Sequence, residues 1–188
     1  MKTMFLIILL GILALGGYLA YTVQTVTHDP AVWHVDPLEV PPSDTPNSFR
    51  IAIPEFTEHP VDLQAPIYAV DAITLSRAFD TFVIGQPRVE RVAGTPEEGW
   101  LTYVQRTPQL QLPDYISARF YNLEDTGQST LAIYSRSRFG YGDLGVNGAR
   151  VRAWLGAIDS FVDEEATEAA RAASEAAEPT ATAAQPTE

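Results

Sequence analysis

The pattern of hydrophobic and polar positions divides the chain into an apolar leading segment, a proline-rich stretch, a region of strand and helix periods, and a polar tail. From Met4 to Val23 there are twenty residues without a charge. At ~1.5 Å per residue this run would span ~30 Å as a helix, the thickness of a bilayer's hydrocarbon core. We predict a transmembrane anchor over residues 1–26. A signal peptide cleaved near Ala14-Leu15-Gly16 is the alternative, although the apolar run continues past that point.

The charges around this segment predict on which side of the membrane the rest of the chain lies. Lys2 and the amino terminus precede the segment, and no Lys or Arg follows until Arg50. Positive flanks stay in the cytoplasm. We therefore expect a single-pass protein of the inner (plasma) membrane with an extracytoplasmic C-terminal domain in the bacterial cell envelope or periplasm. A cleaved signal peptide would export the domain as well.

Between the two ends of the chain, strand and helix periods alternate with turn residues. Apolar side chains recur every three to four residues over Asp71–Ile84 and again over Asn147–Val162, which predicts two amphipathic helices that begin at Asp71 and Asn147. Four strands are predicted between them: Arg88–Ala93, Trp100–Arg106, Tyr115–Leu123 and Thr130–Arg138. The predicted fold class is α+β, a two-layer domain with an antiparallel sheet of about four strands and two helices on one face.

Segments without such periods flank the predicted α+β domain, which covers residues 49–162. Eight of the 14 prolines lie between Pro30 and Pro66, and residues 27–48 are predicted to be a proline-rich linker that becomes a strap along the domain. Phe49–Ile53 is the one part of the proline-rich stretch that could form a short strand. Residues 163–188 are an acidic low-complexity tail that cannot build a core.

Composition narrows the classes of function. The chain has no cysteine, which excludes disulfides, cysteine-bound metals and thiol nucleophiles, and its net charge of -12 argues against nucleic acid as a partner. Its single lysine, Lys2, cannot serve a phosphate-binding loop, and serine-nucleophile and dinucleotide motifs are missing. Its three histidines lack metal-ligand spacing. We predict no catalytic residue, no metal and no cofactor, and an enzymatic activity is unsupported rather than excluded.

Alternation along the predicted strands separates an apolar core face, which includes Leu101 and Ile133, from a face rich in arginine and tyrosine. The second face collects four arginines: Arg106, Arg119, Arg136 and Arg138. Because the guanidinium group offers a planar fork of donors, these are candidates to bind an anionic small molecule, a lipid head group or an acidic protein segment. The structural alternative is an ordinary solvated face on which arginine stems cover tyrosine rings.

A glycine-rich turn from Gly140 to Asn147 leads into the second predicted helix. Its glycines, with Asp143 and Asn147, suit the construction of a turn and a helix start. The same helix start, together with Arg150, could also bind an anion. Asp143, Asn147 and Arg150 therefore join the candidates for anion or partner binding.

The same region resembles a known family. Residues 134–147 read YSRSRFGYGDLGVN, Arg150-Val151-Arg152 follows, and Thr45-Pro46-Asn47-Ser48 lies upstream. With these motifs, residues 44–160 resemble the bacterial and plastid family called domain of unknown function 1499. Many members have cysteine where this chain has Ser48, and a basic residue where it has Gly148. The resemblance implies the extent of the domain but no established activity.

Together these observations predict a membrane-anchored binding module for an anionic ligand or partner. One alternative is a structural interaction module of the envelope, which an exposed apolar patch without a concave arginine site would favour. A hydrolase is the other, and it would need an acid or base such as Asp143 or Tyr134 with a perturbed pKa in a pocket. The positions of the four arginines distinguish these hypotheses.

Overall fold

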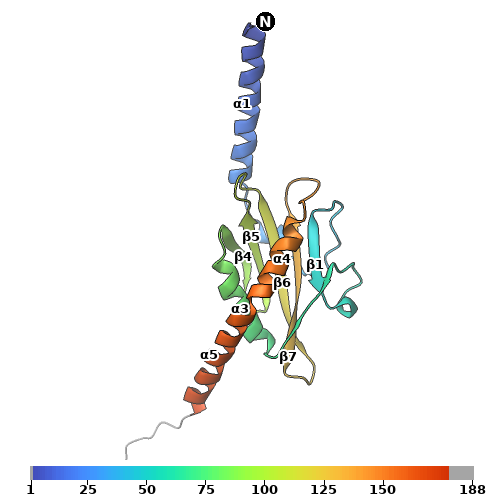
Figure 1. Cartoon of the computed structure of the whole chain (residues 1–188), viewed down its shortest axis with the longest axis vertical. Helices are drawn as coiled ribbons and strands as arrows, with labels where there is room; N and C mark the ends of the chain where they lie inside the picture. Colours follow the sequence, from blue (N-terminus) through green and yellow to red (C-terminus); the bar gives the residue numbers. More distant parts are fainter. Residues whose placement is uncertain (1, 178–188) are drawn as a thin grey trace, which may run out of the picture.

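The computed structural model describes residues 2–177 and consists of a long leading helix that stands clear of an α+β domain (Figure 1). Helix α1 (Lys2–Gln24) has no buried residue. Its length and its apolar composition suit either a membrane anchor or a signal sequence. The last part of the predicted acidic tail, residues 178–188, lies outside the described residues.

A seven-stranded sheet forms the centre of the domain. The hydrogen-bonded order is β2-β1-β7-β6-β5-β4, and β3 also pairs with β7. The strands are β1 (Ser48–Ala52), β2 (Leu63–Gln64), β3 (Ile67–Tyr68), β4 (Val89–Thr95), β5 (Trp100–Arg106), β6 (Pro113–Leu123) and β7 (Gln128–Ser137). A short 3-10 helix, η1 (Pro54–Phe56), follows β1. The sheet is mixed, because β1 and β2 run parallel whereas the other pairs are antiparallel.

All four predicted strands are present, and three further strands enlarge the sheet. Strand β5 has the predicted bounds, and the ends of β4, β6 and β7 shift by one or two residues. The expected antiparallel sheet of about four strands is incomplete, because β1, β2 and β3 (residues 48–68) join it. Of these three, only β1 was considered, as the possible short strand at Phe49–Ile53. Strands β2 and β3 have two residues each, too few to show an alternating pattern.

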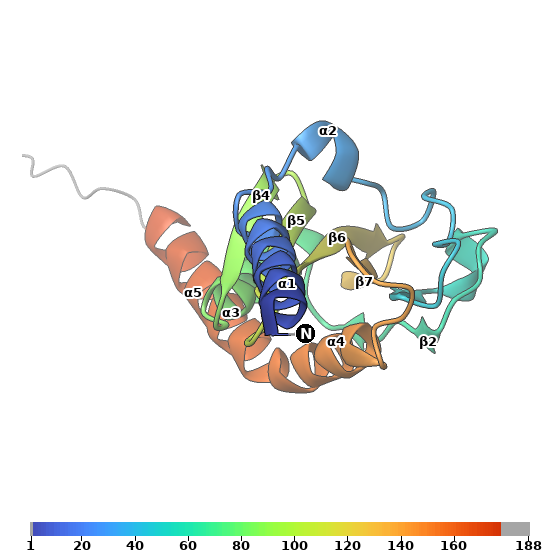
Figure 2. The ribbon, with the colours of Figure 1, turned by 90° about the horizontal axis from the view of Figure 1, so that it is seen from above.

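Three helices lie on one side of the sheet (Figures 1 and 2). Helix α3 (Ala72–Ile84) begins as predicted after Asp71, whose carboxylate accepts hydrogen bonds from the amides of Ile73 (2.9 Å) and Thr74 (3.0 Å). The second predicted helix is two helices, α4 (Val146–Ala157) and α5 (Asp159–Ala177). Helix α4 packs on β7, and α5 packs on α3.

The hydrophobic core lies between these helices and the sheet. Phe79 of α3 is fully buried, and its ring meets those of Phe120, Tyr103 and Trp154 at centroid distances of 5.4–6.1 Å. The apolar strand residues predicted for this face, such as Ile133, belong to the same core. Burial of each such side chain is worth ~1.5–3 kcal/mol.

The opposite face of the sheet is covered by residues 27–40, which we call the strap. It contains the one-turn helix α2 (Pro30–Trp33) and crosses the sheet on the side away from α4 (Figure 2). The ring of Trp33 stacks on that of Tyr115 of β6, with centroids 3.7 Å apart. Most of the predicted linker is therefore an ordered part of the domain, and within residues 2–177 no free stalk separates α1 from the sheet.

Candidate functional site

The strap lies on the face where the sequence places the four arginines. Arg119 forms an ion pair with Asp36 of the strap. Arg136 and Arg138 both lie over the ring of Trp33, with their Cζ atoms 4.8 and 5.3 Å from its centroid. The three arginines share one surface, as alternation predicts, but the chain itself fills that surface.

Backbone carbonyls of the strap accept hydrogen bonds from two of these arginines. Arg136 Nη2 donates to Val32 O at 3.2 Å, and Arg138 Nη1 donates to Thr27 O at 3.0 Å. Burial lowers the pKa of Arg136. These contacts explain why residues without helix or strand periods are ordered here, and they give the two arginines a role in binding the strap.

Arg106 connects the strap to the end of α1. Its Nη1 donates to Val23 O (3.2 Å) and to Gln111 O (3.0 Å), and its Nη2 donates to His28 Nε2 (3.1 Å). Because a guanidinium group only donates, His28 Nε2 must be unprotonated, and Nδ1 donates to the Tyr115 hydroxyl at 2.7 Å. Burial and, second, the charge of Arg106 lower the pKa of His28.

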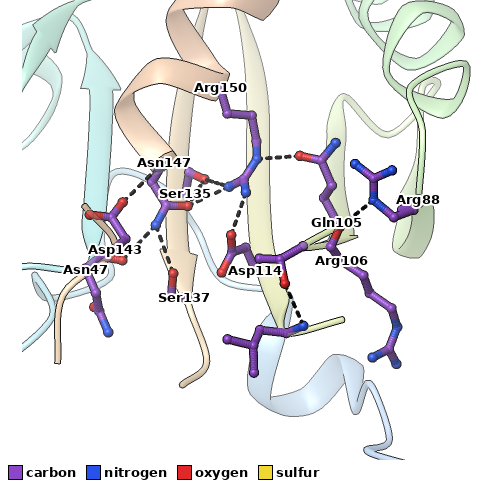
Figure 3. Close-up of polar contacts among 12 residues, drawn as sticks. Asn47, Arg88, Gln105, Arg106, Asp114, Ser135, Ser137, Asp143, Asn147 and Arg150 are labelled. Atoms are coloured by element: carbon purple, nitrogen blue, oxygen red, sulfur yellow. Dashed lines mark hydrogen bonds and ion pairs between the residues drawn. The ribbon is translucent and has the colours of Figure 1, made fainter. Parts of the chain in front are cut away.

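A second polar cluster lies where α4 meets β5, β6 and β7, with Arg150 at its centre (Figure 3). Arg150 Nη2 lies 2.5 Å from Asp114 Oδ2, and Nε donates to Gln105 Oε1 at 2.6 Å. Nη1 donates to Ser135 Oγ (3.0 Å) and Asn147 Oδ1 (2.6 Å). The Arg150 and Asp114 side chains are only 7% and 5% exposed. The charge of Arg150 is therefore neutralised in place and its side chain is fixed.

Asn147 joins segments that are far apart in the sequence. It has no exposed surface, and its Nδ2 donates to Asn47 O (2.9 Å) and Ser137 Oγ (3.2 Å). Asn47 Nδ2 in turn donates to Gly140 O at 2.9 Å. Two asparagines thus hold the proline-asparagine element before β1 against the glycine-rich turn before α4 (Figure 3).

The prediction that Asn147 caps the helix is wrong. Gly145, at a φ of +80°, precedes α4, and the Asp143 carboxylate accepts hydrogen bonds from the amides of Gly145 (3.0 Å) and Asn147 (2.8 Å). Burial alone would raise the pKa of Asp143, but these hydrogen bonds outweigh it and hold the pKa below its ordinary value. An ionised carboxylate therefore occupies the helix start at which a bound anion was considered.

Gly148 leaves room for a side chain of β1. A Cβ atom at position 148 would lie 2.9 Å from Phe49 Cδ2 and 2.8 Å from Arg152 Nη1. The Arg152 guanidinium lies over the Phe49 ring, 4.4 Å from its centroid. The glycine is thus tied to the packing of β1 against α4.

A groove of about 510 Å³ opens between α4 and the end of α3, beside the start of β4 and the end of β5. Its apolar lining residues are Phe82, Pro108, Val146, Ala149, Ala153, Trp154 and Ala157. Its polar lining residues are Gln86, Arg88, Gln105, Arg106, Thr107 and Arg150. This volume is typical of small-molecule sites. The sequence did not predict this groove.

Arg88 supplies the groove with a positive charge that is not neutralised. Its Nε donates to Arg106 O at 2.9 Å, and no carboxylate of residues 2–173 lies within ion-pair distance of it. Its φ is +59°, a conformation that costs a non-glycine residue roughly 1–2 kcal/mol. The guanidinium of Arg106 points away from Arg150, whereas Arg88 lies beside Gln105 (Figure 3).

The seven candidate residues predicted from the sequence form two groups, with Arg106 outside the second. Arg119, Arg136 and Arg138 lie under the strap, and Asp143, Asn147 and Arg150 meet in the second cluster. Arg106 joins the strap to the end of α1. Sequence reasoning missed Arg88, for which the only signal was its place directly after the helix-ending Gly85-Gln86-Pro87. Among the described residues, no three His, Asp or Glu side chains gather as a metal site would require.

A comparison with protein families gives a match over residues 40–158, to a family described as "Protein of unknown function (DUF1499)". The matched residues run from the end of the strap to the end of α4, and they include both asparagines and the Arg150 cluster. No curated protein and no solved structure matches the chain.

Proposed function

We propose that this chain, which belongs to the DUF1499 family of proteins of unknown function, is a membrane-anchored module that binds an amphipathic anion. The observation that carries the proposal is the groove between α3 and α4, which apolar side chains and the unneutralised Arg88 line together. The ligand class is a hydrocarbon chain that bears a carboxylate or phosphate group.

The anchor in this proposal is α1. None of its residues is buried, and its span after Lys2 carries no charge. The positive flank before it favours a cytoplasmic amino terminus and an extracytoplasmic domain in the cell envelope. A cysteine introduced by Glu124→Cys in an exposed turn should react with a membrane-impermeant thiol reagent in intact spheroplasts. Reaction only after lysis would overturn this orientation.

The chemistry of the groove supports an amphipathic ligand. Seven apolar residues line the groove, so a hydrocarbon chain could leave water there. Among the polar lining residues, Gln105 is already engaged: its Oε1 accepts from Arg150 and its Nε2 donates to Pro87 O at 3.2 Å. Arg88 uses only its Nε. Its two terminal nitrogens are therefore available for a bidentate contact with a carboxylate or phosphate.

The test uses the full chain in nanodiscs of zwitterionic lipid, with octyl phosphate, octanoate and octanol as probes. The two anions should raise the unfolding temperature of the domain more than octanol does. Arg88→Gln should weaken binding of both anions about tenfold or more, as expected for loss of a charge-assisted hydrogen bond. Arg77→Gln is the matched control, because Arg77 is an exposed arginine that pairs with Glu97 outside the groove.

A second variant tests the apolar lining. Ala153→Phe places a ring in the groove from an exposed position of α4 and should abolish stabilisation by all three probes without loss of the fold. If the anions fail to stabilise the unaltered chain, or if Arg88→Gln binds them as tightly as Arg77→Gln does, the groove is not an anion site.

A further inference from the structure

We infer that two loops beside α1, residues 107–112 and 138–145, insert apolar side chains into the surface of the bilayer that α1 spans. The inference rests on the proposed anchoring by α1 and is independent of any ligand in the groove. It concerns exposed side chains for which the domain itself offers no packing partner.

The first loop lies directly against the end of α1. Arg106 Nη1 donates both to Val23 O at the end of α1 and to Gln111 O in the loop, at 3.2 and 3.0 Å. Next to Gln111, Leu110 is 69% exposed. If α1 spans a bilayer, this contact places Leu110 close to the lipid head groups.

The second loop presents two large side chains. Tyr141 is 76% exposed and Leu144 is 102% exposed. Leu144 also has a φ of +54°, a conformation that is unfavourable for a leucine and that no buried contact of its side chain offsets. Backbone strain that holds a leucine fully in water points to a contact outside the domain.

The two loops are neighbours on one end of the domain. Thr107 and Leu112 of the first loop line a small hollow together with Phe139 and Leu144 of the second. Figure 1 shows both loops at the end of the sheet from which α1 departs. Leu110, Tyr141 and Leu144 therefore form an apolar rim on the side of the domain nearest to the proposed membrane.

Charge distinguishes this end of the domain from the other. Arg88, Arg106 and Arg138 lie at the end next to α1, where Glu90 and Asp143 also lie, and their guanidinium groups suit anionic lipid head groups. The turns at the opposite ends of the strands carry acidic residues instead: Glu97, Glu98, Glu124 and Asp125. Tyrosine and leucine next to arginine are typical of residues at a membrane interface. A bilayer therefore fits the rim better than a protein partner does.

Because the natural chain lacks cysteine, single cysteines can be labelled with a polarity-sensitive dye. The full chain would be labelled at Leu110→Cys, Leu144→Cys, Ile73→Cys or Leu13→Cys. It would then be reconstituted into vesicles of phosphatidylcholine with phosphatidylglycerol that contain lipids brominated near the head group, to reach the loop labels, and lipids brominated at the ends of the acyl chains, to reach Leu13. Ile73 is the matched control, since it is 45% exposed at the start of α3, where Ala72 N donates to Asn122 at the far end of β6.

Labels at Leu13, Leu110 and Leu144 should be quenched by the brominated lipid, and the label at Ile73 should not be. Quenching at Leu13 without quenching at Leu110 and Leu144 overturns the inference and leaves the anchor intact. No quenching at Leu13 overturns the anchor itself. A protein partner would be favoured, and the inference overturned, if the rim labels stay unquenched in vesicles and a photoreactive reagent on the same cysteines crosslinks to a protein in native membranes.

A second set of variants excludes insertion driven by the dye. With the dye on Tyr141→Cys, addition of Leu110→Asp and Leu144→Asp should at least halve the quenching, because both leucines are exposed and their loss removes no core packing. Far-ultraviolet circular dichroism checks the fold. Unchanged quenching would show that the leucines do not hold the loops in lipid.

Discussion

The indole ring of Trp33 lies nearly parallel to the phenol ring of Tyr115, with an interplanar angle of 8° and centroids 3.7 Å apart. Trp33 belongs to the strap, and Tyr115 to the centre of the sheet. Arg136 and Arg138 lie against the same indole. Trp33 is therefore one of the main contacts between the strap and the sheet.

Replacement of Trp33 by alanine should destabilise the domain. The indole is partly buried, so we expect the free energy of unfolding to fall by about 2–3 kcal/mol, below the cost for a fully buried tryptophan. Chemical unfolding of the full chain in detergent measures this change. Val32→Ala is the matched control, because Val32 is 55% exposed in the same helical turn. Equal stability of the two variants would contradict the role of Trp33.

The ion pair between Arg150 and Asp114 should be costly to break from one side. Arg150→Met leaves a buried carboxylate without its partner and should lower the free energy of unfolding by about 3–5 kcal/mol. Arg77→Gln, which breaks an exposed pair with Glu97, should cost no more than about 1 kcal/mol. The double variant Arg150→Met/Asp114→Leu should recover part of the loss. Additive losses in that variant would show that the two side chains act independently.

Acid should weaken the domain through the histidines of the strap. Burial is the main cause that lowers the pKa of both His28 and His34 in the folded state, whereas the unfolded chain keeps the ordinary value near 6.5. The unfolded chain therefore binds protons first, and the free energy of unfolding is largest above about pH 6.5 and falls as the pH drops below it.

Chemical unfolding at pH 7.5 and pH 5.5 tests this dependence. His28→Gln should reduce the loss of stability between the two pH values. His59→Gln is the control, because His59 is bonded to the carbonyl of Glu39 and does not contact the sheet arginines. If both variants keep the full pH dependence, His28 is not a source of it.

Two glycines of α4 should respond to alanine with opposite signs. Gly148→Ala would force its Cβ against Phe49 and Arg152, and overpacking of this kind typically costs about 1–3 kcal/mol. Around Gly156 no atom lies within 4 Å of an added Cβ. Gly156→Ala should therefore stabilise the helix by roughly 0.5–1 kcal/mol. Thermal unfolding of both variants checks the signs, and equal shifts would contradict the close contact at Gly148.

The sequence predicts those parts of the fold that depend on local periods. Helix α3 and strand β5 follow from the spacing of their own apolar residues, and the burial of Leu101 and Ile133 follows from alternation. The apolar residues of the strap have no regular spacing. Its docking on β6 depends on a contact between Trp33 and Tyr115, which no local sequence pattern shows.

The candidate site was likewise only partly predictable from the sequence. Residue type alone marked the sheet arginines as anion binders, but it could not show that Asp36 and Trp33 meet them. Asn147 suits a helix cap by type, yet its side chain bonds to Asn47, a hundred residues earlier in the chain. Arg88 became a candidate only because α4, which is far from it in the sequence, lines the same groove.

The hydrogen bond from Arg106 to the end of α1 limits how far the domain can move away from the membrane. The strap begins within a few residues of the helix and is bound to the sheet along its length, so little slack chain remains to let the domain swing outward. Anchored in this way, the domain would stay within a thin layer next to the membrane surface. A binding partner would then have to approach the membrane, or already reside within it.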